Sequence, residues 1–88
     1  MICKKYFVSG RVQGVSYRQA IKKQAKASRV QGYAVNLPDG RVEVLLCGSS
    51  SQLEQMSKCL WKGSKFSTVI EVQCIEVECL VPEGFKTA

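Results

Sequence analysis

Two segments with the periodicity of an amphipathic helix divide this sequence, and strand-like segments flank each of them. In residues 17–28 apolar side chains recur every three or four positions, with lysines between them. In the second segment, Ser51 and Glu54 have the spacing of a capping box, and Gly63 is placed to end the helix. The side chains expected on its buried face are Leu53, Met56, Leu60 and Trp61.

The segments between and around these helices have the composition of β-strands. We expect strands at 3–9, 31–36, 41–47 and 69–80, with Leu37-Pro38-Asp39-Gly40 as the turn of a central hairpin. The apolar phase of the last strand shifts between Cys74 and Ile75, which predicts a bulge or bend there. We expect a short terminal strand to begin at Phe85.

The order strand, helix, strand, strand, helix, strand is that of the split β-α-β motif. It predicts one α+β domain over residues 1–88, a ferredoxin-like α/β sandwich (βαββαβ) with an antiparallel sheet and two helices on one face. Many unrelated functions use this fold, so the chemistry has to be argued from particular residues.

The chain has no histidine, which excludes a Ser-His-Asp triad, a Cys-His pair and any histidine-bearing metal site. Its 5 cysteines contain no C-x-x-C pair, so we expect neither a zinc site nor a disulfide scaffold. No apolar run is long enough to cross a membrane, and no signal-peptide pattern begins the sequence, so we expect a cytoplasmic protein.

The net charge of +6 is unevenly placed, because every charged side chain in residues 1–38 is basic and the acidic ones all follow. A positive region of this kind attracts nucleic acid, a membrane surface or a small phosphorylated substrate. Taken one at a time, however, Lys22, Lys23, Lys26 and Arg29 are typical of the solvated face of a helix.

Residues 10–18 join the end of a strand to the start of a helix, where free backbone N–H groups and the helix dipole favour an anion. Gly14 permits a close backbone approach, and the N–H groups from Gln13 to Tyr17 could converge on one phosphate. Arg18 in the first helical turn opposes the dipole unless an anion binds beside it. A plain surface arginine beside a tight turn is the alternative.

Asn36 stands at the end of the second predicted strand. Asparagine there is usually a turn residue. Its alternative role is to hold a water molecule, because the amide both donates and accepts hydrogen bonds.

Two motifs together resemble the signatures of the acylphosphatase family, and the resemblance covers the whole chain. They read Gly10-x-Val12-Gln13-Gly14-Val15-x-Tyr17-Arg18 and Gly32-Tyr33-Ala34-x-Asn36-x-x-x-Gly40-x-Val42-x-x-x-x-x-Gly48. The resemblance implies hydrolysis of acyl phosphates at the carboxyl–phosphate bond, without metal or other cofactor. It also implies that Arg18 binds the phosphate and stabilises the transition state, that Asn36 orients the attacking water, and that the phosphate is cradled by the backbone of Gln13, Gly14, Val15, Ser16 and Tyr17.

Three positions depart from the family pattern. Tyr17 replaces the usual phenylalanine and adds a hydroxyl that needs a partner, whereas Val35 replaces a longer, often basic side chain. Thr87 stands where an aliphatic residue is usual, so the last strand is expected to be weaker.

The predicted fold makes the first and third strands antiparallel neighbours, which places Cys3 beside Cys47. The pair could form a disulfide, or the two thiols could stay reduced in the cytoplasm.

We expect a monomer that acts on a small-molecule acyl phosphate, with no membrane or nucleic-acid partner. The alternative is a module of the same fold that binds phosphate without catalysis, or one that binds nucleic acid. Against nucleic-acid binding, the third strand offers no aromatic side chain for a base to stack on, and its Glu43 would repel the phosphates of the backbone.

Overall fold

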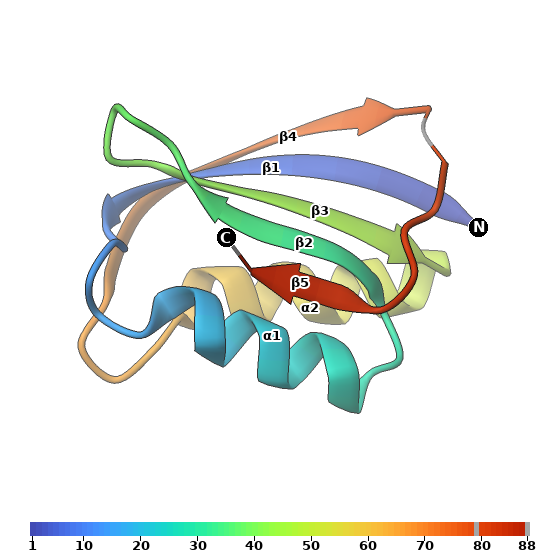
Figure 1. The fold of residues 1–88 in the computed structure, drawn as a ribbon, viewed down its shortest axis with the longest axis horizontal. Coiled ribbons are helices and arrows are strands. Elements are labelled where there is room, and N and C mark those ends of the chain that lie inside the picture. Colours follow the sequence, from blue (N-terminus) through green and yellow to red (C-terminus); the bar gives the residue numbers. More distant parts are fainter. Residues whose placement is uncertain (79, 88) are drawn as a thin grey trace.

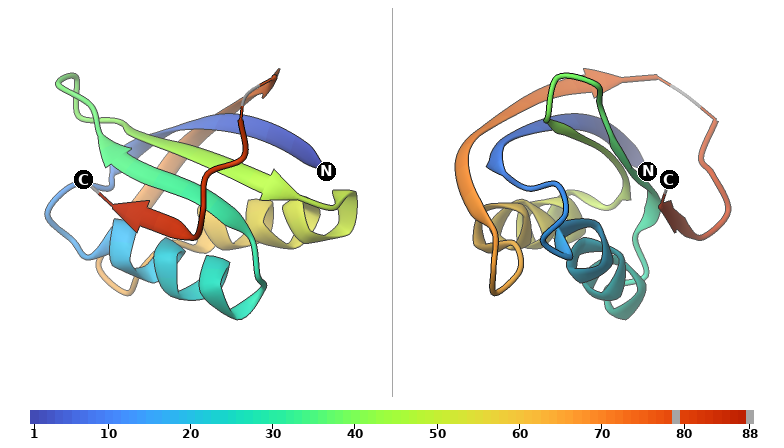
Figure 2. Two further views of the ribbon diagram at one scale, coloured as in Figure 1. Left: turned by 45° about the vertical axis from the view of Figure 1, so that its right-hand side comes forward. Right: turned by 60° about the vertical axis from the view of Figure 1, so that its left-hand side comes forward.

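The computed structural model describes residues 1–78 and 80–87. In chain order its elements are β1 (Ile2–Arg11), α1 (Tyr17–Ala27), β2 (Gln31–Asn36), β3 (Val42–Gly48), α2 (Ser50–Lys62), β4 (Thr68–Val77) and β5 (Phe85–Thr87). The strands form one sheet in the order β4-β1-β3-β2-β5, and both helices lie against the same face of it (Figures 1 and 2). The predicted α+β sandwich is therefore confirmed. Neither helix in this part of the chain is long and apolar enough to span a membrane.

The sheet is mixed rather than wholly antiparallel, which corrects one part of the prediction. The four long strands pair in antiparallel fashion, but β5 runs parallel to β2, with Gly32 opposite Phe85 and Ala34 opposite Thr87. The reason is topological: the chain reverses after β4, and the direction opposite to β4 is the one that β2 already has. Thr87 therefore does take part in the last strand.

The core lies between the helices and the sheet. The face of α1 that packs inward carries Tyr17, Ile21 and Ala25, as the periodicity predicted. On α2 the inward side chains are Leu53, Met56 and Leu60, and the prediction for Trp61 was wrong, because its side chain is 50% exposed. Successive helical residues differ by about 100° in direction, so Trp61 points away when Leu60 points inward. The sheet contributes Val8, Val42, Val44 and Leu46.

The capping box of α2 differs from the predicted one. Ser49, not Ser51, is the N-cap: its hydroxyl accepts a hydrogen bond from the N–H of Gln52, and Oε1 of Gln52 accepts one from the N–H of Ser49. The other end of that amide, Nε2, donates to the carbonyl of Ser28 at 2.8 Å. A glutamate in place of Gln52 could not make this last bond, because a carboxylate has no proton to donate.

Of the bulge or bend predicted between Cys74 and Ile75, the bulge was wrong, since both residues pair in register with β1. The register shifts instead between Ser9 and Gly10, opposite Ile70. Gly10 has φ of 127°, and a Cβ there would collide with the carbonyl oxygen of Thr68, so only glycine allows β1 and β4 to approach so closely. The strand ends at Val77 rather than at residue 80, and Cys79 lies outside the described residues.

The face of the sheet away from the helices carries a second, smaller apolar cluster. Cys3 and Cys47 are direct neighbours in the β1–β3 register, with their Cα atoms 4.2 Å apart, and a disulfide joins them. Leu45 is buried beside them, and Tyr33 and Val77 pack on the cluster. The adjacency expected from the fold is thus confirmed.

Candidate active site

The loop between β1 and α1 has the backbone conformation of an anion nest. Gly14 (φ 72°) and Ser16 (φ 61°) are both left-handed, whereas Val15 between them is not. Such alternation turns successive N–H groups toward one point. Ser16 is also the N-cap of α1, but its side chain caps no N–H of the helix, and the first turn contains no acidic residue. The positive end of α1 therefore lacks the side-chain acceptor that helices usually have there.

A hollow of about 310 Å³ opens at this loop. Arg18 is half-buried in its wall, in the first turn of α1. The lining residues are Val12, Gly14, Ser16, Tyr17, Arg18 and Gln19. The structure thus brings together four of the residues expected at the site, and the hollow has room for a phosphate.

The side chains of Val15 and Tyr17 are buried in the core, so these residues offer only their backbone to a ligand. The Val15 carbonyl accepts a 2.5 Å hydrogen bond from Oγ of Ser64, in the loop after α2. The Tyr17 hydroxyl donates to the carbonyl of Leu60 at 2.7 Å. The β1–α1 loop is therefore held by the C-terminal end of α2 and the loop that follows it.

The Tyr17 hydroxyl, which was expected to need a partner, donates a hydrogen bond to one of the last carbonyl groups of α2. The N–H that would ordinarily bond the Leu60 carbonyl belongs to Ser64, and it donates to Oγ of Ser67 at 2.8 Å instead. Burial, and secondarily the nearby Cys59, raise the pKa of Tyr17 above its ordinary value, so the hydroxyl stays protonated and able to donate.

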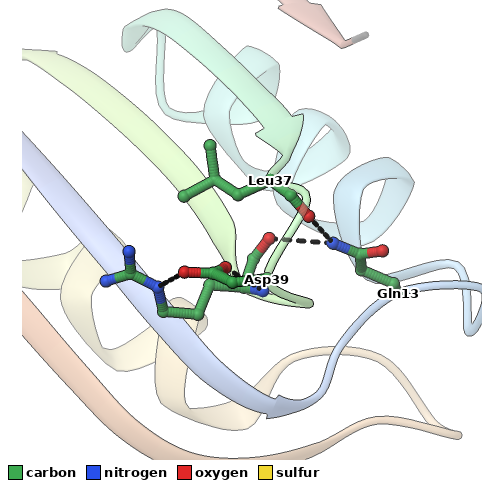
Figure 3. Close-up of polar contacts among 4 residues, drawn as sticks. Gln13, Leu37 and Asp39 are labelled. Carbon is green, nitrogen blue, oxygen red and sulfur yellow. Dashed lines mark hydrogen bonds and ion pairs between the residues drawn. The ribbon is translucent and has the colours of Figure 1, made fainter.

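Gln13 connects the β1–α1 loop to the β2–β3 hairpin. Its Nε2 donates to the carbonyl of Leu37 at 2.8 Å and to that of Arg41 at 2.9 Å (Figure 3). Both N–H bonds of one amide are thus used on the two sides of the hairpin turn. The turn itself is closed by a 2.8 Å hydrogen bond from the Leu37 N–H to the Arg41 carbonyl.

The far side of the turn is held by Asp39. Its carboxylate accepts hydrogen bonds from the backbone N–H of Arg41 at 3.0 Å and from Nε of the same residue at 2.8 Å. These hydrogen bonds lower the pKa of Asp39 below its ordinary value. The Arg41 guanidinium also lies over the ring of Phe7, 5.0 Å from its centre.

Asn36 is the last residue of β2, exposed, and directly precedes Leu37. The end of β2 and the β1–α1 loop lie at the same end of the molecule (Figure 1). Asn36 does not line the hollow that holds Arg18. The Gln13 side chain connects the two parts, because it bonds the carbonyl of Leu37, the residue next to Asn36, to the β1–α1 loop.

The family model for acylphosphatases matches residues 4–87. The chain belongs to the acylphosphatase family. An acylphosphatase of Chromohalobacter salexigens is 50% identical to it over 84 residues, which cover 96% of this chain and 93% of that protein. One of Nitrosococcus oceani is 43% identical over 81 residues, covering 92% and 89%. The crystal structure of acylphosphatase from Bacillus subtilis matches with a TM-score of 0.94 at 31% identity, over 100% of this chain and 99% of that one.

Membership of the acylphosphatase family makes the chain an enzyme and agrees with the fold that the sequence predicted. Two supports of the loop were not foreseen from the sequence: Ser64, and the side-chain role of Gln13. Gln13 was expected only as part of the phosphate-binding backbone. No sequence pattern indicated Ser64, since its hydrogen bond to Val15 joins residues 49 positions apart in the chain.

We expect Gln13→Ala to lower kcat by about tenfold and to destabilise the fold by about 1–3 kcal/mol, because two carbonyl groups lose their shared donor. Steady-state turnover and urea unfolding measure the two effects. Gln55→Ala, at an exposed position of α2, is the matched control and should change neither. Wild-type turnover in the Gln13 variant would contradict a role in aligning the hairpin with the loop.

Proposed function

We propose that this enzyme hydrolyses acyl phosphates at the carboxyl–phosphate bond, with the phosphate in the β1–α1 loop. The observation that carries the proposal is the pair of left-handed residues, Gly14 and Ser16, at the uncapped start of α1 beside Arg18. Backbone N–H groups, a helix end and a guanidinium then converge on one small hollow. This combination suits a phosphate dianion.

Arg18 supplies the charge that the transition state needs. Its planar fork binds two phosphate oxygens, while the loop N–H groups bind the others. As water attacks phosphorus, the bond from phosphorus to the acyl oxygen breaks and the carboxylate leaves with the electron pair. Donors already fixed in place stabilise the developing charge without reorganisation.

The chain provides no histidine to act as a base, so positioning replaces proton abstraction. Asn36 is the residue proposed to hold the water, with its amide oxygen accepting one hydrogen bond and its amide N–H donating another. The proton released by the water passes to a phosphate oxygen of the substrate. An acyl phosphate tolerates this arrangement because a carboxylate is a good leaving group.

The test of the proposed function is steady-state hydrolysis of benzoyl phosphate by the wild-type protein, with inorganic phosphate as inhibitor. We expect turnover without added metal and competitive inhibition by phosphate. Binding of phosphate without turnover would contradict the proposal and favour a non-catalytic phosphate-binding module.

We expect Asn36→Ala to lower kcat by about a hundredfold, as the loss of one positioned hydrogen-bonding group does at other sites. The KM for benzoyl phosphate should change little, because Asn36 lies outside the hollow that is proposed to hold the phosphate. The stability should also stay close to wild type, since the side chain is exposed. An unchanged kcat would remove Asn36 from the mechanism.

A further inference from the structure

A second and larger hollow, of about 560 Å³, lies between α1 and the C-terminal end of α2. Ser16 and Gln19 line both this hollow and the one that holds Arg18, so the two are adjacent. The larger one, called here the α1–α2 groove, has apolar side chains among its lining and lysines from both sides. Its lining includes Ala20, Cys59, Lys23, Lys62 and Lys65.

The charge around the groove is almost entirely positive. Every charged side chain of α1 is basic. The end of α2 and the loop that follows contribute Lys58, Lys62 and Lys65, while the one acidic residue of α2, Glu54, does not line the groove. Within the described part of the chain, no carboxylate pairs with Lys23, Lys62 or Lys65. The Lys65 ammonium lies over the ring of Phe66, 5.7 Å from its centre. Such a concentration of uncompensated charge attracts an anion.

The position of the lysines relates the groove to the reaction. Lys65 directly follows Ser64, whose hydroxyl holds the carbonyl of Val15 in the phosphate loop. Lys23 lies two turns along α1 from Ser16, about 10 Å along the helix axis. The groove continues from the smaller hollow through Ser16 and Gln19, so an acyl group that extends into it from a phosphate in the loop would lie among these cationic side chains.

We propose that the α1–α2 groove is a subsite for the acyl group, and that it favours acyl phosphates whose acyl group carries a second negative charge. The inference rests on the proposed function and adds a substrate class to it. The side chains of Ala20 and Cys59 contact the hydrocarbon part of the acyl group, and Lys62 and Lys65 bind its anionic end. Hydrolysis then releases a dianionic product from one site.

A matched pair of substrates tests this subsite: benzoyl phosphate and 4-carboxybenzoyl phosphate differ only in one carboxylate. We expect wild-type kcat/KM to be about tenfold higher for the carboxylated substrate, which corresponds to two partly exposed ion pairs. The double variant Lys62→Gln/Lys65→Gln should lose this preference and retain its activity on benzoyl phosphate.

The control is Lys22→Gln/Lys26→Gln, which removes the same charge from α1 at residues that do not line the groove. It should keep the preference. An equal loss in both double variants would assign the effect to the overall charge and overturn the subsite, as would a wild-type enzyme without any preference.

Failure of the proposed function is distinguishable, because the enzyme would then hydrolyse neither substrate. In that case calorimetric binding of benzylphosphonate and 4-carboxybenzylphosphonate tests the groove without turnover. Tighter binding of the carboxylated compound, lost in Lys62→Gln/Lys65→Gln only, supports the subsite. Equal binding of the two compounds overturns it.

Discussion

Arg18→Ala is expected to lower kcat for benzoyl phosphate by about a thousandfold, the largest effect on activity of any single substitution proposed for this enzyme. A positioned hydrogen-bond donor alone contributes about a hundred- to a thousandfold at other active sites, and Arg18 combines two such donors with a full charge. The guanidinium lies in the wall of a small hollow beside the left-handed residues of the loop. Nothing else in that lining carries a charge.

Arg18→Lys separates charge from geometry. Lysine keeps the positive charge but offers a single ammonium in place of the planar fork, so we expect it to recover only part of the lost turnover. The inhibition constant for inorganic phosphate should rise in both variants, and more in the alanine variant.

The fold should tolerate either change. A cation in the first helical turn opposes the dipole by about 0.3–1 kcal/mol at exposed sites, and its removal offsets the loss of its contacts. Urea unfolding midpoints close to wild type would show that the activity loss is local. Wild-type turnover in Arg18→Ala would refute the assignment of this residue.

The parts of the fold that the sequence predicted are those that depend on local patterns. The inward faces of both helices follow from residue spacing, and the hairpin follows from Pro38, Asp39 and Gly40. The adjacency of Cys3 and Cys47, 44 positions apart, followed from the strand order, but two other details that depend on neighbours distant in the sequence were wrong. The direction of β5 depends on which edge strand is free to receive it, and the bulge depends on the contact of Gly10 with Thr68.

The N-cap of α2 shows the same limit at shorter range. Ser49 with Gln52 and Ser51 with Glu54 both have the spacing of a capping box, so the spacing alone does not decide where the helix begins. Gln52 then serves two purposes, because its amide bonds Ser49 and also the carbonyl of Ser28 at the end of α1. A pattern that considers only the second helix cannot include that contact.

At the candidate site, the sequence singled out the β1–α1 loop but not the contacts that hold it in place. Gly14 and Arg18 could be recognised because a glycine and an arginine at a strand–helix junction match a local anion-binding pattern. The tethers from Gln13 to Leu37 and from Ser64 to Val15 cross 24 and 49 positions of the chain. Contacts of that kind follow from the folded structure alone.

The disulfide between Cys3 and Cys47 is expected to have the largest effect on stability. The two residues are separated by 44 positions. In the chain-entropy model, a closed loop of that length stabilises the fold by up to about 4 kcal/mol, because the cross-link restricts the unfolded chain. Reduction should therefore lower the free energy of unfolding by up to that amount, measured by urea titration with and without dithiothreitol.

Two variants make the measurement specific. The free energy of unfolding of Cys3→Ala/Cys47→Ala should be lower than that of the oxidised wild type, by about as much as reduction lowers it in the wild type. Dithiothreitol should then have no further effect on this variant. Cys74→Ser changes an exposed free thiol and should leave the response to dithiothreitol intact. Thiol counts under denaturing conditions report how much of the purified protein carries the bond.

Activity should respond differently from stability. Cys3 lies at the start of β1, at the opposite end of the sheet from the β1–α1 loop (Figure 1), and the disulfide is on the face away from the helices. Because the β1–α1 loop is held by Gln13, Tyr17 and Ser64 and not by this bond, kcat below the unfolding transition should be the same in both redox states. A kcat that falls on reduction while the protein is still folded would show instead that β1 transmits strain from the disulfide to the loop.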